Sequence, residues 1–546
     1  MSFALTARSL VASALISALA GVHLPAVAAD AKSSSVGSEY NAASLVGTNL
    51  TGVVDWSGEW VFSDPFKQAR TWISSSKDAW DDGRTLDLDE HGWVKSMLPG
   101  QVARTVMFWS DGEKHYPKGR YQVLYEGEGK LTSFPQPTVA AEPGKLTLMV
   151  DPAKGGISLT LEATNPQNYI RNIRVVMPDG ECDPAGARSC RVPADTSKPS
   201  SMFSRDFLES IRTFRVLRFM DWMNTNGSRI TTFDERPKVT DATYTKKGVP
   251  LEIMVELANA MRADPWFTMP HLADDDYVEK FAEYVRDHLA PDRLVYVEYS
   301  NEVWNSIFAQ SRYAGEQGAK LGLSSDAFEA QLRFYSRKSV QVFRIWEKVF
   351  SGTSRLVRVM ASQAANAWVS EVVLETEGAA QATDALAIAP YIGGFAGDPV
   401  EELRVEKMTP EALLAELSAK GLAETGGWLT KQKDVADRFG VSLIAYEGGQ
   451  HLVGVGNVVN NERITALFHA ANRHPAMKDL YLAYLEQWTR AGGKIFMHFV
   501  NTSAYSKWGS WGANEYLNQP LESAPKADAL LTFIRKHAGH QASTPP

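Results

Sequence analysis

The sequence predicts an α/β protein: a (β/α)8 TIM barrel with an additional antiparallel β-sandwich module near the N-terminus. After residue 200, short apolar runs alternate with helical patterns, which is typical of a parallel sheet covered on both faces. Between residues 80 and 178, β-favouring runs are separated by Gly and Pro turns, which is typical of a sandwich. No Gly-x-Gly-x-x-Gly follows an early strand, which disfavours an open dinucleotide-binding sheet.

The composition is that of a globular protein. The 546 residues are 44% hydrophobic and 22% charged, which supplies enough apolar material for a large core. The net charge of -8 is spread without a basic stripe, so we expect no nucleic-acid partner. The 15 tryptophans suit either sugar platforms or ordinary core packing, because an indole ring serves both purposes.

Residues 1–28 are predicted to be a secretory signal peptide. Arg8 supplies a positive start, residues 10–24 an apolar region, and Ala26-Val27-Ala28 a small-residue cleavage site. Residues 29–44 then form a flexible leader rich in Ala, Ser and Asn. We therefore expect a secreted or periplasmic protein without a membrane anchor after cleavage.

The two cysteines, Cys182 and Cys190, lie in a predicted linker at 181–200. In an exported protein we expect them to form one disulfide, worth about 2–3 kcal/mol through loop closure.

Residues 45–78 are predicted to hold the first barrel strand, in the run 50–56, and its connection. The sandwich module follows over 79–180, and it either binds carbohydrate or supports its neighbour. Its strands are predicted from Gly and Pro punctuation and from alternation such as Leu146, Leu148 and Val150. They cover 101–108, 120–125, 145–150, 157–161 and 170–176.

The catalytic barrel is predicted over 201–540. Its apolar runs give strands at 216–222, 266–271, 294–299, 356–361, 385–389, 441–446 and 494–500. Periodic and capped segments between them give helices at 205–214, 251–261, 277–289, 328–350, 369–376, from 409, 428–439, 479–490 and 530–537.

Two of these strands end in the same way. The strand at 294–299 runs into Ser300-Asn301-Glu302, and the strand at 441–446 runs into Glu447. In a parallel barrel the carboxyl ends of all strands share one rim, so their polar residues converge there. The alternative is that these residues only cap the helices that follow. The other strand ends add Arg218, Asp221, His271, Ser362, Gln363, Tyr391, Asn501, Tyr505, Trp508 and Trp511.

Two glutamates on one rim, with an arginine and aromatic rings beside them, fit the cleavage of a glycosidic bond. One carboxylic acid must protonate the leaving oxygen, and the other must meet the oxocarbenium-like carbon.

The chain here resembles clan A of the glycoside hydrolases, which are retaining (β/α)8 enzymes. The resemblance rests on Asn301-Glu302 after the fourth strand, Glu447 after the seventh and a tryptophan after the eighth. It implies a β-linked glycan as substrate. Val303 stands where the clan usually has a proline after Asn-Glu, and no single family of the clan is indicated.

The resemblance also implies roles for these residues. Glu302 would be the acid/base and Glu447 the nucleophile, with Arg218 and Tyr391 beside the nucleophile. Asn301 would bind the sugar 2-hydroxyl, His271 would match a third-strand histidine, and Trp508 or Trp511 would lie under the cleaved sugar. Structural alternatives stay open: an ion pair for Arg218, a helix cap for His271, packing for Tyr391, and either a sugar subsite or packing for Trp304. Glu298 is expected to be a structural partner inside the barrel.

The sequence therefore predicts a secreted retaining glycoside hydrolase that cleaves a β-linked polysaccharide or oligosaccharide. We expect a monomer without a metal or cofactor. Two alternatives remain: a transglycosylase on the same scaffold, and a glycan-binding protein that has lost catalysis.

Overall fold

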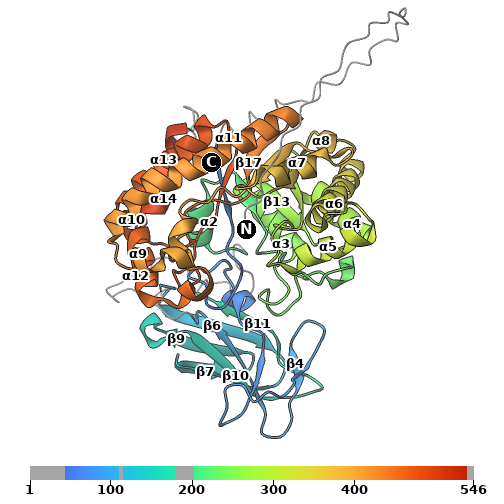
Figure 1. Ribbon diagram of the computed structural model, residues 1–546. Helices are drawn as coiled ribbons and strands as arrows, with labels where there is room; N and C mark the ends of the chain where they lie inside the picture. The colour runs from blue at the N-terminus through green and yellow to red at the C-terminus, as the bar shows by residue number, and fades with distance from the viewer. Residues whose placement is uncertain (1–43, 110–114, 179–201, 538–546) are drawn as a thin grey trace, which may run out of the picture.

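The computed structural model describes residues 44–109, 115–178 and 202–537 (Figure 1). The predicted signal peptide, most of the leader, Cys182 and Cys190 lie outside the described residues, so those predictions stay predictions. Within the described ranges, no helix combines the length and apolarity that crossing a membrane requires.

Eight parallel strands close into a barrel, as the sequence predicts. Helices surround it, and the ring that they form is visible in Figure 1. The strands are β1 (Val46–Asn49), β12 (Val216–Arg218), β13 (Asp264–Met269), β14 (Val295–Tyr299), β15 (Leu356–Ala361), β16 (Ala385–Ile388), β17 (Ser442–Ala445) and β18 (Phe496–His498).

The strands form because their residues are buried on both sides. Every residue of β13 and β14 is buried, and the stacked rings of Trp266 and Tyr296 join the two strands at 5.2 Å between centroids. Such continuous apolar runs suit a parallel sheet, in which helices cover the outer face and side chains fill the interior.

The first strand is not where the sequence analysis placed it. The run 50–56 was predicted, but the strand is β1, and residues 50–56 belong to the loop that leaves it. β1 has the sequence Val-Gly-Thr-Asn and is defined by its neighbours, with Val46 opposite Phe496 and Thr48 opposite Leu217. A Cβ at Gly47 would lie 2.4 Å from the Met497 sulfur, so position 47 requires a glycine, which interrupts the apolar run by which a strand is recognised in the sequence.

Helices follow most strands. Thr409 caps α10 with Pro410 in its first turn, and Gly440 ends α11 at a φ of 67°, both as the sequence indicates. The helices are α2 (Arg205–Ile211), α3 (Leu251–Met261), α4 (Asp275–His288), α5 (Ala309–Lys320), α6 (Ala327–Phe350), α7 (Ala367–Glu375), α8 (Ala379–Ala382), α9 (Glu402–Val405), α10 (Pro410–Glu416), α11 (Leu422–Phe439), α12 (Glu462–Arg473), α13 (Ala476–Arg490) and α14 (Pro525–His537).

The strands from β2 to β11 form what we call the β module, at the bottom of Figure 1. It contains two four-stranded antiparallel sheets, in the orders β2-β5-β10-β7 and β11-β6-β9-β8, and a two-stranded sheet of β3 and β4. It begins at β2, before the predicted boundary at 79. The strands are β2 (Ile73–Ser75), β3 (Asp87–Leu88), β4 (Val94–Ser96), β5 (Val102–Met107), β6 (Gly119–Glu126), β7 (Gly129–Phe134), β8 (Thr138–Glu142), β9 (Lys145–Val150), β10 (Ile157–Thr164) and β11 (Arg171–Val176).

The β module is an insertion between β1 and α2, inside the first βα unit. Its two ends lie side by side: Phe62 and Phe203 form an antiparallel bridge, and the Ser63 amide donates to the Met202 carbonyl at 2.9 Å. Loops that follow barrel strands leave from the face where the strands end. The module is therefore attached to the face that carries Glu302 and Glu447.

Candidate active site

The two glutamates reach the rim from strands β14 and β17. β14 ends at Tyr299, and the chain then turns sharply: Ser300 has a φ of 60° and Glu302 a φ of 42°. Left-handed backbone is costly for residues with a Cβ, and such positions gather at functional sites. Glu447 follows β17 directly, after the fully buried Tyr446.

Arg218, the last residue of β12, joins the acidic groups of the barrel interior. It is fully buried and forms ion pairs with Glu447 at 3.0 Å and with Glu298 at 2.9 Å. It also donates to Asn301 Oδ1 at 2.8 Å and to Asn49 Oδ1 at 3.0 Å. Charged groups are buried only when they are paired, and here one guanidinium serves two carboxylates and two amides.

Glu298 lies within β14, four residues before Glu302. It is fully buried and accepts hydrogen bonds from Arg218 and from Trp266 Nε1, the latter at 2.8 Å. It holds Arg218 in place from inside the barrel.

Each catalytic candidate accepts two hydrogen bonds, and one of the donors to Glu302 is the neighbour of Glu447 in the chain. Tyr446, which precedes Glu447, donates to Glu302 Oε1 at 2.9 Å, while Asn305 donates to Glu302 Oε2 at 2.9 Å. Glu447 accepts from Arg218 through Oε1 and from the Tyr391 hydroxyl through Oε2, both at 3.0 Å. The sites on β14 and β17 are thus fixed to each other.

Burial governs the protonation of the pair. It raises the pKa of Glu447 to about 8; Arg218 opposes this rise, and the charges of Glu302 and Asp221 add to it. Burial also raises the pKa of Glu302, against the hydrogen bonds from Asn305 and Tyr446. Two carboxyls that repel each other in a buried site hold a proton at a higher pH than exposed carboxyls do.

Asn301 belongs to a chain of amides beside the glutamates. Its Oδ1 accepts from Arg218, and its Nδ2 donates to Asn226 Oδ1 at 3.1 Å. Gln310 donates to the same Asn226 oxygen at 2.7 Å and to the Asn301 carbonyl at 2.8 Å. Because an amide nitrogen carries two hydrogens, the second hydrogen on Nδ2 has no acceptor among the residues that the structure describes.

Aromatic rings surround the Tyr391 side of the site. The Trp511 ring lies 5.8 Å from that of Tyr391, 5.3 Å from that of His451 and 5.9 Å from that of Phe499. Trp508 in the same loop is exposed, and its carbonyl accepts from Trp511 Nε1 at 2.9 Å. Of the two candidate platforms, the structure brings Trp511 to the site.

Two predicted residues lie apart from this network. His271 is buried after β13, its ring 5.5 Å from that of Tyr313, and burial lowers its pKa to about 4, so the ring is neutral at physiological pH. Trp304 is partly buried against the core, and its Nε1 has no hydrogen-bond partner among the described residues. Neither contacts Glu302 or Glu447 through a described hydrogen bond.

Five further residues of the network were given no role in the sequence analysis: Asn49, Asn226, Asn305, Gln310 and Tyr446. Tyr446 and Asn305 stood within three positions of the predicted glutamates, so their proximity was a usable signal. Asn49 would have been found had β1 been placed correctly, because it ends that strand. Asn226 lies in a loop without any pattern in the sequence.

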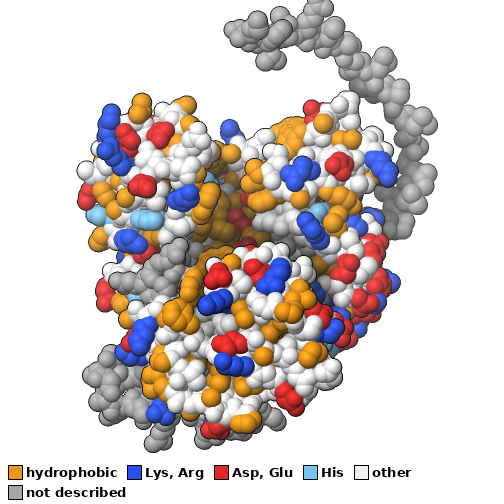
Figure 2. Space-filling view, turned by 90° about the horizontal axis from the view of Figure 1, so that it is seen from below, with side chains coloured by type: hydrophobic (Ala, Val, Ile, Leu, Met, Phe, Trp, Pro, Cys, Tyr) orange, Lys and Arg blue, Asp and Glu red, His pale blue; other side chains and the backbone are white. Residues whose placement is uncertain are grey.

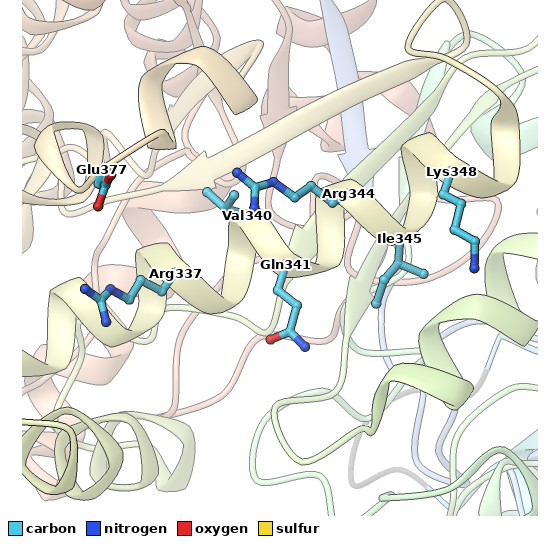
Figure 3. A pocket seen from close by; sticks show the side chains of 7 residues that line it. All are labelled: Arg337, Val340, Gln341, Arg344, Ile345, Lys348 and Glu377. Carbon is cyan, nitrogen blue, oxygen red and sulfur yellow. The ribbon is translucent and has the colours of Figure 1, made fainter.

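The molecule is hollowed at one face. Figure 2 shows a depression between two lobes, with hydrophobic side chains on its walls and acidic side chains inside it. A second hollow lies over α6 and is separate from the rim. Arg337, Val340, Gln341, Arg344, Ile345, Lys348 and Glu377 line it (Figure 3).

Comparisons with known proteins yield distant structural likenesses. No family model matches the sequence, and no curated protein matches it. The GH51 arabinofuranosidase from Xanthomonas axonopodis pv. citri is 11% identical, with a TM-score of 0.37, over 58% of this chain and 63% of its own. The chain thus spans less than two thirds of that protein.

Two other solved structures are similarly distant. An endo-beta-1,4-mannanase from Thermotoga petrophila is 10% identical, with a TM-score of 0.33, over 62% of this chain and 74% of its own. A beta-glycosidase from Thermosphaera aggregans is 11% identical, with a TM-score of 0.35, over 61% and 86%. At these identities and scores, none of the three indicates a substrate for this chain.

Proposed function

We propose that the protein is a retaining glycoside hydrolase of clan A that cleaves a β-linked polysaccharide with Glu302 and Glu447. One observation carries the proposal. A buried carboxyl, Glu447, and a partly buried one, Glu302, follow the ends of two strands of one closed barrel, and among the described residues only Glu447 of the two is in contact with a guanidinium. This asymmetry gives the two acids different tasks.

Burial raises the pKa of both carboxyls, so the pair holds a proton at neutral pH, and we place that proton on Glu302 because the contact with Arg218 favours the ionised form of Glu447. Glu447 attacks the anomeric carbon while Glu302 protonates the leaving oxygen, which gives a covalent glycosyl-enzyme. Glu302 then takes a proton from water, the water oxygen bonds to the anomeric carbon, and Glu447 leaves. One glycosidic bond is broken, one water is consumed, and the configuration is retained.

The roles are tested with Glu302→Ala and Glu447→Ala on an aryl glycoside with and without azide. On the natural polymer, Glu302→Ala should have a kcat about 10²–10⁴-fold below that of the wild type, because the general acid is missing. In Glu302→Ala, azide attacks the glycosyl-enzyme and gives a glycosyl azide with the configuration of the substrate. In Glu447→Ala, azide replaces the nucleophile and gives the opposite configuration.

The substrate is found by screening β-glucan, mannan, xylan and bacterial exopolysaccharides and determining the product anomers by NMR. Normal hydrolysis by either alanine variant would overturn the assignment. Tight binding of a glycan without cleavage or transfer would favour the catalytically inactive alternative.

We also propose that the protein is exported, on the strength of residues 1–28. Amino-terminal sequencing of the mature protein should begin after Ala28. A chain that keeps Met1 when expressed in its own host would contradict this.

A further inference from the structure

Three exposed tryptophans belong to the insertion that carries the β module. Trp80 is 39% exposed, Trp109 37% and Trp56 55%. The rings of Trp80 and Trp109 lie with centroids 6.1 Å apart and planes 19° from parallel. Tryptophan is highly buried on average in folded proteins, so a paired and exposed arrangement points to a ligand.

The two rings are held by the fold. The Ser75 hydroxyl donates to the Trp80 carbonyl, and the Arg104 guanidinium lies 5.5 Å from the Trp80 ring. The Trp109 ring rests on Gly156, where an added Cβ would come within 2.9 Å of it. Their positions therefore exist before any ligand arrives, which reduces the ordering cost of binding.

The pair is connected to the mouth of the barrel by one loop, residues 51–59. At its barrel end, the Thr51 amide donates to Asn501 Oδ1 at 3.0 Å, and Asn501 Nδ2 donates to Glu59 at 2.7 Å. On its module side, the Trp109 amide donates to the Asp55 carbonyl at 2.7 Å. Trp56 follows Asp55 directly, on the path between the two ends.

We infer that Trp80 and Trp109 form a second binding site for the polysaccharide, outside the site that holds the bond to be cleaved. This rests on the proposed function, because the ligand is the same glycan chain. A sugar ring has an apolar C–H face and a polar edge, and an exposed indole with charged neighbours such as Arg104 suits both. A protein partner is disfavoured, because a stable interface needs about 800 Å² per partner, which two partly exposed indoles do not supply.

The test compares the wild type with Trp80→Ala/Trp109→Ala on the polymer that the wild type cleaves and on a short aryl glycoside. A short substrate occupies only the barrel, so it reports folding and catalysis. The double variant should lose about tenfold in kcat/KM on the polymer, mainly through KM, and keep its activity on the short substrate. Trp80→Phe/Trp109→Phe should keep most of the polymer activity, because the ring faces remain.

The matched control is Met149→Ala, which removes an apolar side chain of similar exposure (37%) from the other sheet of the module. Binding is measured by affinity electrophoresis in polymer-containing gels, with Glu302→Gln/Glu447→Gln added to each protein to prevent cleavage. Unchanged polymer kinetics and retention in the double tryptophan variant would overturn the inference while the proposed function stands. Equal losses on both substrates would also overturn it, since the role would then be structural. A wild type that cleaves no glycan would overturn the proposed function itself.

Discussion

The tyrosines beside the two glutamates adjust the pKa values on which the pH dependence of the site rests. The proposed mechanism requires an ionised Glu447 and a protonated Glu302, so kcat/KM should be bell-shaped, with both limbs above the usual range of a glutamate. The Tyr391 hydrogen bond lowers the pKa of Glu447, and the Tyr446 hydrogen bond lowers that of Glu302. Each tyrosine therefore bears on a different limb.

We expect Tyr391→Phe to raise the pKa of Glu447 and to move the acid limb to higher pH by about one unit. Tyr446→Phe should instead raise the pKa of Glu302 and move the alkaline limb to higher pH. Profiles of kcat/KM on a short substrate check both. The reverse pattern would exchange the roles of the two acids.

Ser300 is a residue whose conformation lowers the folding stability of the protein. Its φ is 60°, and its buried hydroxyl has no partner within the described part of the chain. Ser300→Gly should raise the free energy of unfolding by about 1 kcal/mol, because it relieves left-handed backbone and removes an unpaired hydroxyl. Urea denaturation measures this. Ser300→Ala separates the two causes, since it keeps the Cβ; an equal gain in both variants would attribute all of it to the hydroxyl.

Among the elements, α14 supports the loop that carries Trp508 and Trp511. Lys526 in its first turn is fully buried, and its Nζ donates to the Ser510 carbonyl. Gln450 donates to the same carbonyl at 2.8 Å. The backbone next to Trp511 is thus fixed by two donors from outside its loop.

Lys526→Met keeps the packing of the side chain and loses the donor. We expect KM on an oligosaccharide to rise about fivefold as Trp511 loses its position, with a smaller change in kcat. Lys536→Met is the control on the same helix, because Lys536 is exposed and pairs only with Glu486 in the described structure. Equal effects of the two substitutions would contradict a positioning role.

The elements also show what the sequence could reveal. The strand at 356–361 and the helix start at Thr409-Pro410 were predicted to the residue, because an apolar run and a cap are local signals. α5 was missed, since its sequence lacks an apolar stripe; it packs on α6 at Gly318, where a Cβ would meet the Ala330 carbonyl at 2.3 Å. β1 was misplaced for a related reason, because its partners rather than its composition define it.

In the candidate site, too, residues marked by a local sequence signal could be predicted, and residues defined by distant contacts could not. Glu302, Glu447 and Arg218 could be predicted because each ends a recognisable strand. Asn226 could not, because its contact with Asn301 joins positions 75 apart in the chain. Trp511 and Trp508 were indistinguishable in sequence, and only the packing against Tyr391 separates them.

At the scale of the whole molecule, buried acidic residues make the free energy of unfolding depend on pH. Glu59 joins the β1 loop to Asn501, and burial raises its pKa from 4.5 to about 8. The folded state then binds a proton that the unfolded state has released between those values, so this group makes stability fall as pH rises from about 4.5 to about 8.

Glu59→Gln should flatten the dependence of stability on pH in that window and raise the free energy of unfolding at its upper end. Urea denaturation at several pH values checks this. A variant with an unchanged slope would show that Glu59 is ionised in the folded protein throughout. Asp87→Asn is a suitable control, because Asp87 is exposed and its pKa is lowered rather than raised.

The antiparallel bridge between Phe62 and Phe203 joins the two ends of the insertion. Because the chain enters the insertion at Phe62 and leaves it at Phe203, and these two residues are paired, the segment between them could be replaced by a two-residue hairpin turn. Such a replacement would leave every strand of the barrel in place, because β1 ends before the insertion and β12 begins after it.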